Sequence, residues 1–130
     1  MTEAITGPRP VTFVHAPLLN AQAKLDIVLA SETLQYTGSF KFRAGFSNAS
    51  QARGEHLIAA SSGNFGQALA FACRMLGKRC TIVMHHDSQP FKMKAVRGYG
   101  GEVDLVDPNV ISPAARLAEL LGRHPDATAA

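Results

Sequence analysis

The sequence predicts an α/β fold, an open parallel sheet of about four strands with helices on both faces. Short apolar runs alternate with longer segments in which apolar residues recur at helical spacing. Turn and cap residues separate the two kinds of segment. The short runs are mostly apolar, which is typical of parallel strands covered by helices on both sides.

Four apolar runs are expected to form the strands, and a helical segment follows each of them. The strands are expected at 25–30, 56–60, 79–84 and 102–106, and the helices at about 39–52, within 61–76, after Pro90 and at 112–122. Ser39 and Ser112 are expected to cap the amino ends of their helices. Gly77 and Gly122 are expected to end theirs.

The expected domain organisation is an amino-terminal arm, one α/β domain and a short tail. The arm covers residues 1–24 and contains three prolines before a possible short helix at 18–23. The α/β domain covers 25–124. The tail, 125–130, is rich in alanine and is expected to fray.

Composition excludes several classes of protein. With 130 residues and 46% hydrophobic residues, the chain can form one core and is not disordered. Its net charge of +3 comes from dispersed basic residues, so no nucleic-acid partner is expected. Apolar runs are too short to span a membrane, and the chain opens without a secretory pattern. Cys73 and Cys80 lack CxxC spacing, so a reduced, cytoplasmic protein is expected.

The turn SSGNFGQ, residues 61–67, places two hydroxyls, a glycine and an amide where a strand becomes a helix. In an open parallel sheet, ligands bind at the carboxyl ends of the strands. The free N–H groups and positive dipole of a helix start suit a carboxylate or a phosphate, and Gly63 allows close approach of the backbone. The alternative is that Ser61, Ser62 and Asn64 only cap the helix.

The turn TGSFKFR, residues 37–43, places Lys41 between Phe40 and Phe42 in the first turn of a helix. Partial desolvation beside aromatic rings disfavours a charged amine and leaves it nucleophilic. Such an amine can form a Schiff base with a carbonyl compound. The alternative is an ordinary surface lysine whose stem packs on phenylalanine.

Other polar groups on the ligand side of the sheet are less informative. His85 and His86 follow the strand at 79–84, but no carboxylate or cysteine stands at a metal-ligand spacing, so no metal is expected. The glycines at 98, 100 and 101 are typical of a helix end and a turn. No GxGxxG pattern follows a strand.

Taken together, the two turns resemble a known family. The strings LQYTGSFKFRA and AASSGNFGQALAFACRMLGKRCTIVM closely resemble fold-type II enzymes that use pyridoxal phosphate, and most of all the serine/threonine dehydratase and serine racemase branch. The resemblance covers about residues 17–106. Phe42 follows the lysine where the cysteine-synthase and threonine-synthase branches usually carry an acid, which favours the dehydratase branch.

The resemblance implies pyridoxal 5′-phosphate as the cofactor. Lys41 matches the lysine that forms a Schiff base with the cofactor and later moves the α-proton. Phe40 matches an aromatic residue beside the pyridine ring. Asn64 matches the asparagine whose amide hydrogen-bonds the phenolic oxygen of the cofactor.

The resemblance also implies an amino acid substrate. Ser61, Gly63 and Phe65 lie in the loop that receives the substrate carboxylate, together with Ser62 and Asn64. Ser62 matches the serine that acts as the opposite-face acid or base in racemases. The implied reaction is the dehydration and deamination of threonine or serine to a 2-keto acid and ammonia, with a serine racemase-like activity as an alternative.

Members of this family are much longer than 130 residues. Their glycine-rich phosphate loop, and the group at the pyridine nitrogen, are expected beyond residue 130. The chain is therefore expected to be the lysine-bearing part of such an enzyme without most of its large domain, and to form a homo-oligomer or associate with that domain. The alternatives are a non-catalytic binding or assembly module and a small nucleotide- or phosphate-binding domain.

Overall fold

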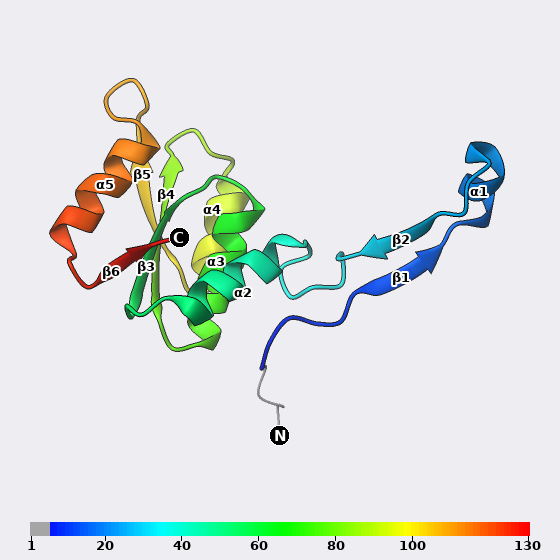
Figure 1. Cartoon of the computed structure of the whole chain (residues 1–130). Helices are drawn as coiled ribbons and strands as arrows, with labels where there is room; N and C mark the ends of the chain where they lie inside the picture. Colours follow the sequence, from blue (N-terminus) through cyan, green and yellow to red (C-terminus); the bar gives the residue numbers. More distant parts are fainter. Residues whose placement is uncertain (1–5) are drawn as a thin grey trace.

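The computed structural model describes residues 6–130 and contains a parallel four-stranded sheet with helices on both faces (Figure 1). The strands are β3 (His56–Ala60), β4 (Arg79–His85), β5 (Glu102–Val106) and β6 (Ala127–Ala129). Their order across the sheet is β5-β4-β3-β6. The predicted α/β fold is therefore confirmed.

Four helices cover the sheet. On one face lie α2 (Lys41–Gln51), α3 (Asn64–Met75) and α4 (Pro90–Gly98), and on the other lies α5 (Pro113–Arg123) (Figure 1). The larger core lies under α2, α3 and α4, and a smaller one lies under α5 around Ile58, Val83, Val106 and Leu120. The fully buried side chains of the larger core include Phe42, Leu57, Leu69, Ile82 and Val96.

One predicted strand belongs to a different sheet. The run at 25–30 was expected in the parallel sheet, but β2 (Val28–Ser31) pairs antiparallel with β1 (Thr12–His15), and α1 (Pro17–Ala23) connects the two. This hairpin projects from the α/β unit (Figure 1), and Val28 is 46% exposed. An apolar run predicts a strand but not the strand with which it pairs. Here the backbone groups of β2 find their hydrogen-bond partners in β1, which lies close by in the sequence.

The carboxyl-terminal tail supplies the fourth strand of the parallel sheet. Residues 125–130 were expected to fray, and this prediction is wrong, because β6 pairs with β3 and the N–H of Ala130 donates to the carbonyl oxygen of Ile58 at 3.1 Å. The physical reason is the path of α5, which packs across β3 and β4. It returns the chain to the free edge of β3, where backbone groups need partners.

The helix ends confirm two predictions. Ser112 Oγ accepts the N–H of Ala115 at 3.1 Å and caps α5. Gly77, at φ +69°, follows the end of α3. There the N–H of Lys78 donates to the carbonyl oxygen of Cys73 at 2.8 Å, as in a Schellman motif.

Two other predictions of helix ends are wrong. Gly122 lies inside α5, which continues to Arg123. Ser39 does not cap its helix: α2 begins at Lys41, and the N–H of Phe42 donates to the main-chain oxygen of Ser39 at 3.2 Å. The hydroxyl of Ser39 is buried and has no hydrogen-bond partner among residues 6–130.

Candidate functional site

Lys41 begins α2 and lies against an aromatic ring, as the sequence predicts. Its Nζ atom is 4.9 Å from the centroid of the Phe40 ring. The side chain of Lys41 is half-buried, and Phe42, the next residue, is fully buried. Burial of Phe42 therefore anchors the first turn of α2, which begins at Lys41.

The SSGN turn follows β3 and opens α3. Ser61 Oγ accepts the N–H of Gly66 at 3.1 Å and a longer contact from the N–H of Gly63 at 3.4 Å. The capping interpretation therefore holds for Ser61. In the described part of the chain, the backbone N–H groups of Ser62, Asn64 and Phe65 have no acceptor. These groups can bind a carboxylate or a phosphate at the helix start.

A cavity of about 420 Å³ brings the two turns together. Phe40 comes from the first turn and Asn64 from the second. The lining residues are Ala30, Glu32, Thr33, Gly38, Ser39, Phe40 and Asn64. Close by, Ser39 Oγ and Thr37 Oγ1 are buried hydroxyls without hydrogen-bond partners among residues 6–130. Unpartnered buried polar atoms are uncommon and often indicate a functional site.

Glu32 is a carboxylate in this cavity that the sequence did not single out. Arg43 binds it through two hydrogen bonds, Nη2 to Oε1 at 2.8 Å and Nε to Oε2 at 3.0 Å. These bonds lower the pKa of the Glu32 carboxyl below its ordinary value. Glu32 is therefore an ionised group whose charge Arg43 balances at the cavity wall.

Helices α2 and α3 approach each other closely at Gly45. A Cβ atom at this position would lie 2.8 Å from the backbone carbon of Ala68 and 2.8 Å from the nitrogen of Leu69. Glycine therefore permits a contact between the two helices that no other residue allows without movement. This contact sets the spacing between the helix that begins at Lys41 and the helix that begins at Asn64.

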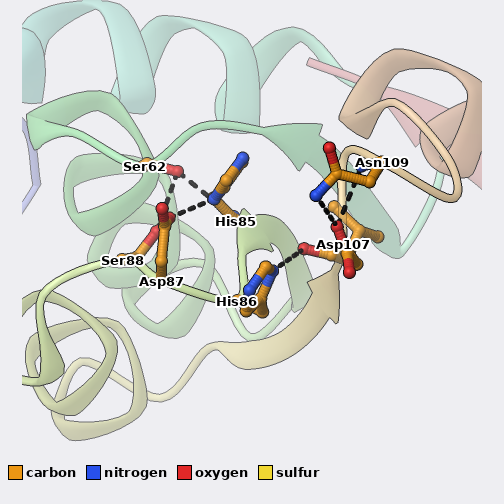
Figure 2. Close-up of polar contacts among 8 residues, drawn as sticks. Ser62, His85, His86, Asp87, Ser88, Asp107 and Asn109 are labelled. Atoms are coloured by element: carbon orange, nitrogen blue, oxygen red, sulfur yellow. Dashed lines mark hydrogen bonds and ion pairs between the residues drawn. The ribbon is translucent and has the colours of Figure 1, made fainter.

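Polar groups that follow β4 surround Ser62 (Figure 2). Ser62 Oγ accepts the hydroxyl of Ser88 at 3.2 Å and the backbone N–H of His85 at 3.4 Å. The imidazole of His85 also contacts the carboxylate of Asp87. The sequence placed His85 and His86 on this side of the sheet but did not indicate Ser88. Over residues 6–130, no three side chains gather as potential metal ligands.

A second polar cluster lies at the opposite, amino-terminal end of the strands. His56 Nε2 is 2.8 Å from Thr81 Oγ1, and that hydroxyl donates to the carboxylate of Glu102 at 3.4 Å. Thr81 therefore accepts the Nε2–H of His56. The other ring nitrogen, Nδ1, is buried and has no partner among the described residues. These side chains line a cavity of about 190 Å³ together with Arg79 and His124.

This cluster predicts a dependence of stability on pH. Burial lowers the pKa of His56, and the nearby Arg79 and His124 lower it further. The unfolded chain therefore binds this proton first, as the pH falls through about 6.5, while the folded chain resists it. We expect the free energy of unfolding to fall by about 1–3 kcal/mol between about pH 8 and about pH 5, because protonation creates a buried donor without an acceptor.

Denaturant unfolding at several pH values measures this effect. His56→Gln can keep the hydrogen bond to Thr81 and removes the titration, so its stability is expected to change less with pH than that of the wild type. His15→Gln alters an exposed histidine of β1 and serves as the control. Equal pH slopes for the wild type and His56→Gln would contradict the prediction.

Comparison with known proteins shows the family. A family described as pyridoxal-phosphate dependent enzymes matches residues 4–130. The chain belongs to this family. The resemblance that the two turns predicted is thereby confirmed at the level of the family, and pyridoxal phosphate is the cofactor of the family.

Two relatives of the chain among pyridoxal-phosphate dependent enzymes share about two fifths of the aligned positions. An L-threo-3-hydroxyaspartate ammonia-lyase of Pseudomonas sp is 40% identical over 93 residues, which make up 68% of this chain and 29% of that enzyme. A catabolic L-threonine dehydratase of Staphylococcus aureus is 38% identical over 90 residues, or 66% of this chain and 26% of the dehydratase. The chain thus spans under a third of these relatives.

A solved structure supports the fold. The processed form of threonine deaminase isoform 2 from Solanum lycopersicum matches with a TM-score of 0.81 and 25% identity. The match covers 94% of this chain and 35% of the deaminase. Over the residues that the structure describes, no helix has the length and apolar character needed to cross a bilayer.

Proposed function

We propose that this chain is the lysine-bearing part of a pyridoxal-phosphate-dependent lyase that converts a hydroxy-amino acid into a 2-keto acid and ammonia. One observation carries the proposal: the amine of Lys41 lies on the ring of Phe40, and Phe40 shares a cavity with Asn64. The aromatic ring and the amide line one cavity next to a helix start with free N–H groups, and the amine of Lys41, which does not line the cavity, lies against the ring.

The residues present fit the aldehyde and ring of the cofactor. Lys41 would be the nucleophile for the aldehyde, Phe40 would support the ring, and the amide of Asn64 would hydrogen-bond the phenolic oxygen. The unpartnered hydroxyls of Ser39 and Thr37 offer further polar contacts near the ring. When bound, the cofactor supplies an electron sink for the carbanion chemistry of amino acids.

The substrate is proposed to be held by its carboxylate at the start of α3. The free N–H groups of Ser62, Asn64 and Phe65 bind that carboxylate, and the amine of Lys41 accepts the α-proton. Loss of this proton and of the β-hydroxyl releases water. Addition of water then gives the keto acid and ammonia. Hydroxyaspartate and threonine, which the names of two relatives contain, are both β-hydroxy-amino acids.

A second polypeptide region is proposed to complete the site. The hairpin exposes large apolar side chains, with Phe13 68%, Leu18 83% and Leu25 64% exposed. Apolar surface of this extent usually marks an interface. We infer that a large domain, in the same or another chain, covers the hairpin and contacts the phosphate.

The free thiols of Cys73 and Cys80 fit a reducing compartment such as the cytoplasm.

Borohydride trapping tests the proposal. The chain is mixed with pyridoxal phosphate, reduced and digested, and the labelled lysines are identified by mass spectrometry. We expect Lys41 to carry at least about tenfold more label than Lys24 or Lys92, equivalent to 1.4 kcal/mol of preference. Lys41→Arg is expected to remove this label, whereas Lys92→Arg leaves it in place.

The result also separates the proposal from its rivals. Label spread evenly over the lysines, even with a large-domain partner supplied, would contradict the proposed role of Lys41. Selective label without release of keto acid from serine or threonine, when a large-domain partner is supplied, would favour a non-catalytic cofactor-binding module. Loss of chirality in the remaining serine would instead indicate a racemase.

A further inference from the structure

The amino-terminal segment crosses the loop that leads to Lys41 and is bound to it by a buried glutamine. Residues 6–11, which we call the strap, meet this loop at Arg9. Gln35 is only 5% exposed. Its Oε1 atom accepts the backbone N–H of Arg9 at 3.1 Å, and its Nε2 atom donates to the carbonyl oxygen of Arg9 at 2.7 Å. One side-chain amide therefore pairs with the main chain of the strap as a neighbouring strand would.

The side chain of Arg9 makes a second set of contacts with the same loop. Its Nη1 atom donates to the carbonyl oxygen of Leu34 at 2.6 Å. The guanidinium lies over the ring of Tyr36, with its central carbon 4.3 Å from the ring centroid. The loop is therefore held on both sides of Gln35 by a residue that lies far from it in the sequence.

Helix α2 joins this network through Arg43. Arg43 Nη2 donates to the carbonyl oxygen of Arg9 at 2.8 Å, and the same guanidinium binds Glu32. The carbonyl oxygen of Arg9 thus accepts from both Gln35 and Arg43. Three segments, namely the strap, the loop at 32–36 and the first turn of α2, meet at one main-chain oxygen.

The network continues directly into the turn that carries the lysine, residues 36–41. The carbonyl oxygen of Gln35 accepts the N–H of Gly38 at 2.9 Å, and Gly38 adopts φ +69°. Tyr36, under the Arg9 guanidinium, packs edge-on against Phe42 at 5.2 Å between ring centroids. Hydrogen bonding and ring packing therefore hold Gly38 and Tyr36, which lie in the turn between the network and Lys41.

We propose that Gln35 and Arg9 are positioning residues that hold the turn at 36–41 so that the amine of Lys41 stays against the ring of Phe40, which lines the cavity together with Asn64. This inference rests on the proposed function, because it assigns the network a role in the reactivity of Lys41. Neither residue touches the cavity itself. Their effect on the amine passes through the backbone of the turn.

The test uses Gln35→Leu, which keeps the side-chain volume and removes both hydrogen bonds to the strap. We expect the label at Lys41 after trapping with pyridoxal phosphate and borohydride to fall about tenfold, equivalent to 1.4 kcal/mol, with the label at Lys24 unchanged. Amide hydrogen exchange at Gly38 is expected to speed up about tenfold as well. Gln51→Leu is the matched control, since Gln51 is exposed on α2 and its side-chain amide donates to Ser47 Oγ.

If Gln35→Leu does not fold, the variant Arg9→Ala tests the positioning role in its place. Arg9 is exposed, so its replacement spares the core, and we expect a smaller loss of Lys41 label, about threefold, from the contacts to Leu34 and Tyr36. Arg9→Lys restores a cation over Tyr36 and is expected to recover part of the label. A general loss of stability would not be rescued in this way, and circular dichroism confirms that the compared variants are folded.

Two results distinguish failure of this inference from failure of the proposed function. If the wild type labels Lys41 selectively and Arg9→Ala and the folded Gln35→Leu match it in label and in exchange at Gly38, the positioning role is overturned. If the wild type shows no preference for Lys41, the proposed function fails and the positioning role fails with it. Accelerated exchange confined to residues 36–42 in that case would show only that the strap anchors the loop.

Discussion

The variant Phe42→Ala is expected to be strongly destabilised. Phe42 is fully buried, and its ring lies 5.2 Å from Tyr36, 6.0 Å from Phe46 and 5.9 Å from Phe71. Truncating a buried phenylalanine to alanine typically costs about 3–5 kcal/mol, and domains of this size are stable by about 5–15 kcal/mol. The midpoint of denaturant unfolding should therefore fall sharply.

Phe91→Ala provides the matched control, because Phe91 lies in α4 and is 64% exposed. Its loss is expected to change the free energy of unfolding by no more than about 0.5 kcal/mol. The comparison also concerns function, since Phe42 anchors the turn that carries Lys41. If both variants unfolded at the same denaturant concentration, the assignment of Phe42 to the centre of the core would be wrong.

Local patterns in the sequence predicted the elements well but did not predict every strand pairing. Mostly apolar runs identified β3, β4 and β5, because strands covered on both faces bury most of their side chains. The run at 25–30 has the same composition, yet β2 pairs with β1 in a projecting hairpin. The tail at 125–130 has little β propensity, yet it forms β6 against β3. Both outcomes depend on which backbone edge lies nearby, which no local pattern specifies.

The candidate site was predictable where its chemistry is local. Lys41 between two phenylalanines, and the polar turn at 61–64, can be singled out as candidates from neighbouring residues, and their joint resemblance to a family decided against the structural alternatives. Glu32 and Ser88 could not be recognised, because their roles depend on contacts made across the fold with Arg43 and Ser62. Arg9 is a still clearer case, since it reaches the loop before Lys41 from an otherwise unremarkable amino-terminal segment.

The close contact between α2 and α3 at Gly45 can be tested with the variant Gly45→Ala. Alanine favours a helix by about 1 kcal/mol over glycine, so propensity alone predicts a more stable protein. However, the added Cβ would lie 2.8 Å from the backbone of Ala68 and 2.8 Å from that of Leu69, where neither side can yield easily. Overpacking of this kind costs about 1–3 kcal/mol or more. We therefore expect a net loss of stability, measured by denaturant unfolding.

Gly122→Ala is the matched control, because Gly122 also lies inside a helix, α5, but a Cβ there would meet no atom within 4 Å. The same chemical change should stabilise the chain at position 122 and destabilise it at position 45. Since separating α2 from α3 also moves Lys41 away from Asn64, Gly45→Ala should lose label at Lys41 under conditions where it remains folded, and Gly122→Ala should not. A stabilised Gly45→Ala variant with full label would show that the contact between the helices does not set the geometry of the site.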